Sequence, residues 1–153
     1  MLLMWDSLTV ISLQLAVSIL TQKMPAFRGI TLGTLISGLA WILLVLHPSV
    51  IVAVATLIVV AIGEITQQPR YYEYISRLAP EGQQGTYMGF AFLPIGIGSF
   101  IGGPFGGFLL HHFGEVRHEP ALIWWSISGV GLATAGLLWV YDRFIRQEKT
   151  AVA

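Results

Sequence analysis

The feature that most constrains this chain is a series of long apolar runs, separated by short links that carry proline, glycine or charged residues. About 20 helical residues span the roughly 30 Å hydrocarbon core of a bilayer. In lipid, backbone polar groups must bond within their own segment, so runs of this kind form helices. We therefore expect an all-α membrane protein with five transmembrane helices, at about residues 2–21, 29–46, 50–79, 83–113 and 121–141.

The composition agrees with a membrane-embedded chain. Hydrophobic residues make up 55% and charged residues 10% of the 153 residues, and the mean hydropathy is +0.74. A soluble domain carries roughly 25% charged residues. The net charge of zero gives no reason to expect a nucleic-acid partner, and the absence of cysteine excludes disulfides, thiolate metal sites and cysteine nucleophiles. The first expected partner is therefore the lipid bilayer.

The basic residues predict an orientation. With five spans, seven of the eight Lys and Arg residues fall on one side, and only Arg117 lies opposite. By the positive-inside rule the first side is cytoplasmic. We expect residues 1–145 to hold a partial transmembrane bundle of the inner or plasma membrane, and residues 142–153 to form a cytoplasmic tail. An odd number of spans with an outside start also favours a piece of a longer protein.

The polar centre of the chain is Glu64, which follows fourteen apolar or small residues in the third run. Ionisable residues inside a membrane are costly, so they face protein or a water-filled cavity and usually have a function there. Such a carboxylate can carry a proton near neutral pH or hold a cationic group. The other interpretation is a structural carboxylate that is hydrogen-bonded to a neighbouring helix.

Further polar residues follow Glu64 on the same run. Helical spacing predicts that Glu64, Gln67, Tyr71 and Tyr74 share one face. We expect this face, with Gln68 beside it, to be a cavity wall that binds a polar substrate. The same residue types also mark a helix that nears the membrane interface, so both interpretations stay open.

A second face of this helix carries Arg70, Glu73 and Arg77, in which Glu73 and Arg77 have the i,i+4 spacing of an ion pair. We expect a solvated salt-bridge cluster at the cytoplasmic end. The alternative is a latch of an inward-facing gate.

Small residues form stripes at helical spacing, and these predict close helix packing. One stripe lies in the second run at Gly29, Gly33, Ser37 and Ala40. A denser stripe lies in the fourth run, which should pack tightly against a neighbour; its members are Gly85, Gly89, Gly96, Gly103, Gly106 and Gly107. Pro69 and Pro94 are expected to bend their helices.

One set of motifs is similar to a known family. Gly63-Glu64 is followed by Pro69, Ala79-Pro80, Gly85 and Met88-Gly89. These residues, at these intervals, resemble the tenth and eleventh helices of the proton-dependent oligopeptide transporters, a branch of the major facilitator superfamily. The resemblance implies that the five helices correspond to helices eight to twelve of a major facilitator fold.

The resemblance also implies a function. It is that of a secondary transporter in which two halves rock about a midplane site, here moving di- or tripeptides together with protons. Its partners would be the missing N-terminal half, a small-molecule substrate and protons, and Glu64 would couple protons or hold a substrate ammonium group. Asp6, where the family often has an Asn-Pro pair, is a further candidate ligand. A carrier of drug-like or sugar-like solutes, and a non-transporting membrane subunit, remain alternatives.

Nothing in the sequence favours an enzyme. No Ser-His-Asp arrangement and no dinucleotide-binding fingerprint can be argued from the spacing of residues. His111, His112 and His118 lack the spacing of metal ligands on one helix face. We expect no catalytic residues, no cofactor and no metal site.

Overall fold

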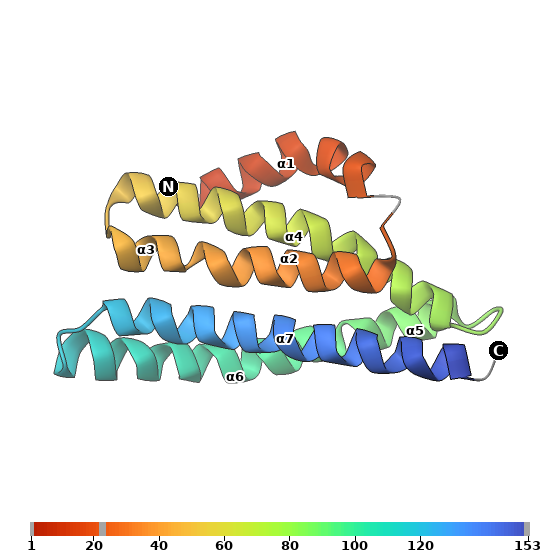
Figure 1. Cartoon of the computed structure of the whole chain (residues 1–153). Coiled ribbons are helices and arrows are strands. Elements are labelled where there is room, and N and C mark those ends of the chain that lie inside the picture. The colour runs from red at the N-terminus through yellow and green to blue at the C-terminus, as the bar shows by residue number, and fades with distance from the viewer. Residues whose placement is uncertain (1, 22–23, 152–153) are drawn as a thin grey trace.

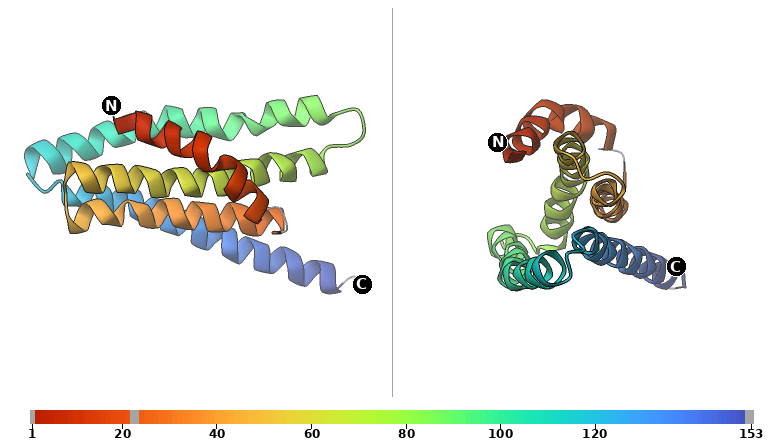
Figure 2. Two further views of the ribbon diagram at one scale, coloured as in Figure 1. Left: turned by 90° about the horizontal axis from the view of Figure 1, so that it is seen from above. Right: turned by 90° about the vertical axis from the view of Figure 1, so that its left-hand side faces the viewer.

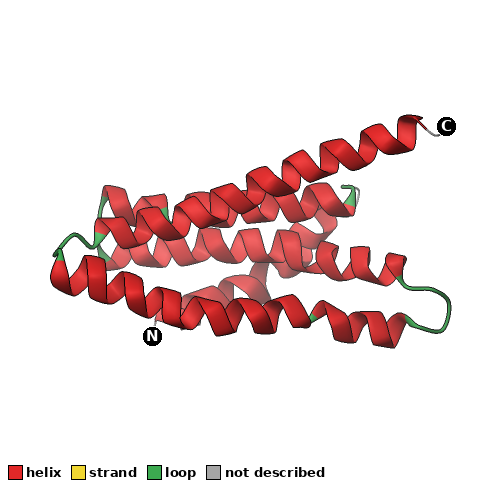
Figure 3. Ribbon diagram, turned by 90° about the horizontal axis from the view of Figure 1, so that it is seen from below, coloured by secondary structure: helices red, strands yellow, loops and turns green. Residues whose placement is uncertain are grey.

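The computed structural model describes residues 2–21 and 24–151, with side chains over residues 10–21 and 24–144. Every element in these ranges is a helix (Figure 3). The elements are α1 (Leu2–Thr21), α2 (Ala26–Ala40), α3 (Ile42–Leu46), α4 (Val50–Leu78), α5 (Gln84–Ala91), α6 (Leu93–Leu109), the π-helix η1 (Leu110–Val116) and α7 (Ala121–Ala151). The expected all-α class is confirmed.

Four segments are long and apolar enough to cross a bilayer. They are α2 with α3 (Ala26–Leu46), α4 (Val50–Leu78), α5 to η1 (Gln84–Val116), and α7 over Ala121–Phe144. In α1, the part with described side chains, Val10–Thr21, is apolar but shorter. Four of the five expected spans are thus present as long helices, while the first span stays a prediction.

The helices form an open bundle in which α2 lies between α4 and α7 (Figure 1). α1 crosses α4 obliquely on the side away from α7 (Figure 2). α5 contacts the C-terminal part of α4, and α6 then runs back along the bundle to η1, which touches α7. The N-terminal end of α2, the turn between α4 and α5, and the C-terminal end of α7 therefore lie at one end of the molecule (Figure 1).

The helix α4 positions most of the candidate site, and its limits follow from local chemistry. Ser49 caps it, because its hydroxyl oxygen accepts a hydrogen bond from the Val52 amide at 3.3 Å. The helix is continuous through Pro69. It ends where Ala79 adopts an extended backbone, as expected for the residue that precedes Pro80.

Small residues join α2 to its two neighbours. A Cβ built on Gly33 would lie 2.5 Å from the Gly63 carbonyl oxygen, so α2 and α4 touch backbone to backbone there. A Cβ on Gly131 would lie 2.8 Å from the Gly38 Cα, which places α7 equally close on the other side. The Ser128 hydroxyl donates a 2.8 Å hydrogen bond to the Gly38 carbonyl oxygen across this second contact. The small stripe predicted in the second run is therefore a packing face.

The glycine-rich α6 differs from α2. Residues 92–108 are all exposed, and no atom lies within 4 Å of a Cβ built on any of the six glycines of the second stripe. The end view in Figure 2 shows α6 standing apart from α2. Within the described part of the chain this stripe has no neighbour, so its packing role stays a prediction.

The helix limits differ from the limits of several predicted spans. The helix breaks at Phe92, two residues before Pro94, because proline has no amide to continue the helical bonding. The expected loop after residue 113 is instead the π-helix η1, which continues to Val116. The helix α7 continues to Ala151 rather than ending near residue 141, since no Gly or Pro interrupts residues 137–151 and Arg, Gln, Glu and Lys are good helix formers.

Candidate functional site

The side chain of Glu64 is half-buried and lines a cavity of about 310 Å³. α4 supplies most of the lining, and α1 lies across it with Val10 and Gln14. The remaining lining residues are Ile65, Gln68, Pro69 and Tyr72. The carboxylate therefore lies between two helices, beside amide and phenol groups.

A second cavity of about 450 Å³ lies next to the first, and Gln68 and Tyr72 line both. It opens between α4 and the start of α6, where Pro94 and Ile95 form part of the wall. Gln67, Tyr71 and Ile30 complete its lining. Together the two cavities extend along α4 from Glu64 to Tyr72, about one helical turn on either side of Gln68.

The predicted shared face is present only in part. Gln67 and Tyr71 line the second cavity, whereas the cavity of Glu64 takes Gln68 and Tyr72, which are four and eight residues further along α4. Tyr74 lines neither of these cavities; its ring meets Phe27 of α2 edge-on, with centroids 5.8 Å apart. The cause is the close packing of α2, which covers the part of α4 on which Tyr74 lies.

Two side chains of the site also connect helices. The Thr34 hydroxyl of α2 donates a hydrogen bond to the Gln67 side-chain oxygen at 2.8 Å. The Tyr71 hydroxyl donates to the Ala91 carbonyl oxygen at 2.9 Å, directly before the helix break at Phe92. The second cavity is therefore bounded by a polar contact from α4 to α5 and another from α4 to α2.

The remaining residues of the site differ in whether the sequence predicted them. Asp6 lies outside the residues whose side chains the structure describes. Gln14 was recognisable in the sequence only as one of several polar residues in the first run, and its place beside Glu64 depends on how α1 crosses α4. Ile30, Pro94 and Ile95 were not predicted, because apolar residues on neighbouring helices carry no local signal of a cavity.

The basic cluster at the end of α4 is less exposed than predicted. Arg70 is 8% exposed, and its stem lies over Gly29, where an added Cβ would meet the Arg70 Cγ at 2.7 Å. Its Nη1 lies 2.6 Å from Glu73 Oε2, and Arg77 Nη2 lies 2.7 Å from Glu73 Oε1. The ion pairs are present, but the expectation of a solvated face was wrong for Arg70, because the absence of a side chain at Gly29 lets α2 cover it.

The described residues contain no group of three or more His, Asp or Glu residues able to hold a metal. At the other end of the molecule His111 and Glu115 form an exposed contact of 2.7 Å between Nδ1 and Oε2. This pair lies on η1 and is remote along the chain from both cavities.

The chain is similar in sequence to bacterial proteins named as multidrug resistance proteins. It is 32% identical to the multidrug resistance protein MdtH of Aeromonas salmonicida (strain A449) over 77 residues, 50% of this chain and 19% of the relative. It is 33% identical to the protein of the same name from Yersinia pestis (strain Pestoides F) over 82 residues, 53% of this chain and 20% of the relative. The matched part thus spans about a fifth of these curated relatives.

No solved structure matches the chain. The sequence profile of the Major Facilitator Superfamily, a family of transporters and not of enzymes, matches residues 1–151. This match extends over nearly the whole sequence and agrees with the long apolar helices described above. The chain belongs to the Major Facilitator Superfamily.

Proposed function

We propose that this chain forms part of a secondary transporter for small drug-like organic molecules, and that the two cavities beside α4 belong to the solute route. The observation that carries the proposal is the chemistry of their walls. Ligand cavities in proteins are usually about 300–1,000 Å³, mostly apolar, with a few polar groups. The cavities here, of about 310 and 450 Å³, have this composition.

The lining favours a drug-like solute over a peptide. A di- or tripeptide carries an ammonium and a carboxylate, so its carrier needs a cationic group as well as an anionic one. The described linings of the two cavities contain Glu64 but no Lys, Arg or His. Arg70, one turn away, packs on α2 and is paired with Glu73. The names of the curated relatives, multidrug resistance proteins, support the same choice.

Within this proposal Glu64 is the charged group at the solute site. A carboxylate among Tyr72, Gln68 and apolar side chains suits a lipophilic solute that carries a positive charge. The same group is placed to exchange a proton as the cavity is wetted and closed, which would couple transport to a proton gradient. Gln67, Gln68 and Tyr71 would contact polar parts of the solute, and we propose a cytoplasmic location for the end that carries Arg70 and Arg77.

The experiment is transport by the full-length gene product in proteoliposomes with an imposed pH gradient. Ethidium, a fluorescent lipophilic cation, and radiolabelled dialanine are tested side by side. We expect pH-driven movement of ethidium that Glu64→Gln abolishes. Glu115→Gln, which alters an exposed carboxylate at the other end of the molecule, is the matched control and should transport normally.

Each other outcome has a defined meaning. Dialanine uptake without ethidium transport would contradict the proposal and restore the peptide interpretation, which the intervals from Gly63-Glu64 to Met88-Gly89 favour. Normal pH dependence in Glu64→Gln would remove Glu64 from the mechanism. No flux of either solute, under conditions in which the protein is folded and inserted, would favour a non-transporting membrane subunit.

A further inference from the structure

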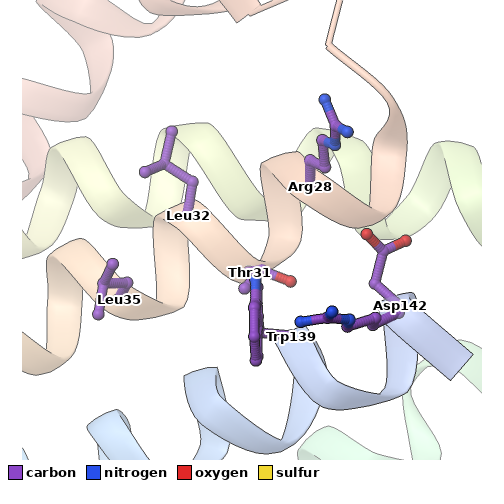
Figure 4. A pocket seen from close by; sticks show the side chains of 7 residues that line it. Arg28, Thr31, Leu32, Leu35, Trp139 and Asp142 are labelled. Carbon is purple, nitrogen blue, oxygen red and sulfur yellow. The ribbon is translucent and has the colours of Figure 1, made fainter.

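A third cavity lies apart from the site described above. It has a volume of about 510 Å³ and opens between α2 and α7 (Figure 4). It shares no lining residue with the two cavities beside α4. Its lining residues lie near the beginning of α2 and at residues 139–143 in the C-terminal part of α7. The beginning of α2 and the C-terminal part of α7 lie at the same end of the molecule (Figure 1).

The lining changes in polarity along the helix axes. The charged residues Arg28, Asp142 and Arg143 lie at the end of the bundle. Leu32 and Leu35 follow on α2, about one and two turns deeper, and they are 36% and 38% exposed. A cavity that spans a membrane interface in this way offers charge at headgroup depth and an apolar wall at acyl-chain depth.

The aromatic residue of the cavity is consistent with that depth. Trp139 lines the cavity (Figure 4) and is exposed. The Arg143 guanidinium lies over its ring at 5.6 Å from the centroid. Tryptophan prefers the interfacial region of a bilayer. The ring also orients Arg143 along the cavity wall, since cation–π contact holds the guanidinium without neutralising its charge.

The charges leave the cavity positive. Two guanidinium groups, those of Arg28 and Arg143, line the cavity together with one carboxylate, that of Asp142, which has an interaction of its own. Guanidinium groups bind phosphate by paired hydrogen bonds. Basic pockets between transmembrane helices are suited to anionic lipid headgroups for this reason.

We propose that this cavity binds an anionic phospholipid. The phosphate of the headgroup would lie between Arg28 and Arg143, and one acyl chain would follow Leu32 and Leu35 along α2. Thr31, on the same wall, supplies a hydroxyl near the headgroup. The proposal concerns the cavity between α2 and α7 and does not depend on which solute the transporter carries.

The test is native mass spectrometry of the delipidated chain in detergent, with dioleoyl phosphatidylglycerol or dioleoyl phosphatidylcholine added in equal amounts. The two lipids differ in headgroup charge and have the same acyl chains. We expect preferential retention of phosphatidylglycerol. In Arg28→Gln/Arg143→Gln the preference should fall about fivefold for each arginine removed, which corresponds to about 1 kcal/mol per basic residue.

The matched control is Arg117→Gln. Arg117 also lies over an aromatic ring, that of Phe113 at 5.8 Å, but it lies at the opposite end of the molecule. This variant should keep the preference. A second variant, Arg28→Lys/Arg143→Lys, loses the paired hydrogen bonds but keeps both charges, so it should still prefer phosphatidylglycerol. The test therefore holds even where the glutamine variant folds poorly.

Three outcomes would overturn the proposal. One is equal binding of the two lipids by the unchanged chain. Another is an unchanged preference in the folded glutamine variant. The third is displacement of phosphatidylglycerol by an equal concentration of inorganic phosphate or glycerol phosphate, which would show that the cavity takes a free anion and that the acyl wall of Leu32 and Leu35 is not used.

Discussion

The contact between α2 and α4 allows a quantitative prediction for Gly63→Ala. The added Cβ would lie 2.7 Å from the Gly33 carbonyl oxygen, about 0.7 Å closer than the 3.4 Å of an ordinary contact. Ser37, whose hydroxyl is also in the way, can change rotamer, but a backbone carbonyl in a helix cannot. The two helices must therefore separate by several tenths of an ångström where they are closest.

The free energy follows from two opposing effects. Overpacking a close contact costs typically 1–3 kcal/mol, while alanine in place of glycine stabilises a helix by roughly 0.5–1 kcal/mol. We expect the free energy of unfolding to fall by about 1–2 kcal/mol in Gly63→Ala. The matched control is Gly102→Ala in α6, where no described atom lies within 4 Å of the new Cβ. This control should raise the free energy of unfolding by about 0.5–1 kcal/mol.

The assay is unfolding of the purified chain in mixed micelles, titrated with sodium dodecyl sulfate and followed by circular dichroism at the helical band. Both variants have the same composition, so differences in detergent binding cancel in the comparison. If Gly63→Ala were as stable as Gly102→Ala, the close approach of α2 to α4 would be refuted. The cavities beside α4 would then have no fixed wall on that side.

Two further pairs of variants test other contacts by the same assay. Glu73→Gln removes the negative charge that pairs with the nearly buried Arg70, and it should lower the free energy of unfolding by about 1.5–3 kcal/mol. Arg77→Gln changes a side chain that is 75% exposed and should lower it by less than about 1 kcal/mol. Equal losses would contradict the burial of Arg70. Thr56→Val removes a buried hydroxyl that has no hydrogen-bond partner among the described residues, and it should leave stability unchanged or higher. Ser128→Ala loses the bond to α2 and should cost about 1 kcal/mol. The reverse order would contradict these assignments.

The membrane class could be predicted from the sequence because it depends on composition and run length. The lipid core sets the length of each helix, and the links Met24-Pro25 and His47-Pro48 interrupt the runs. The helix limits that differ from the predicted span limits are those without such a signal. η1 and the last turns of α7 continue an existing helix through polar residues, and polar residues with good helix propensity do not stop a helix.

The candidate site was predictable on one helix and not across helices. Glu64 could be found because a carboxylate in an apolar run is rare, and Gln68 and Tyr72 lie close to it on α4. Which polar residues share its cavity depends on the path of α1, and that path is not encoded in the local spacing. Helical periodicity placed Gln67 and Tyr71 with Glu64, but the neighbouring helices divide that surface into two cavities.

The two glycine stripes show what periodicity can and cannot specify. Gly33 in α2 and Gly103 in α6 belong to stripes of similar spacing, yet Gly33 touches the backbone of α4 and Gly103 touches nothing in the described chain. Small residues permit close approach but attract no particular helix, because dispersion acts between any two surfaces that fit. The choice of partner is made by groups that are specific, such as Ser128 with the Gly38 carbonyl and Thr34 with Gln67. Within the described residues α6 offers no such side-chain hydrogen bond to another helix, and this explains why its stripe is open while that of α2 is filled.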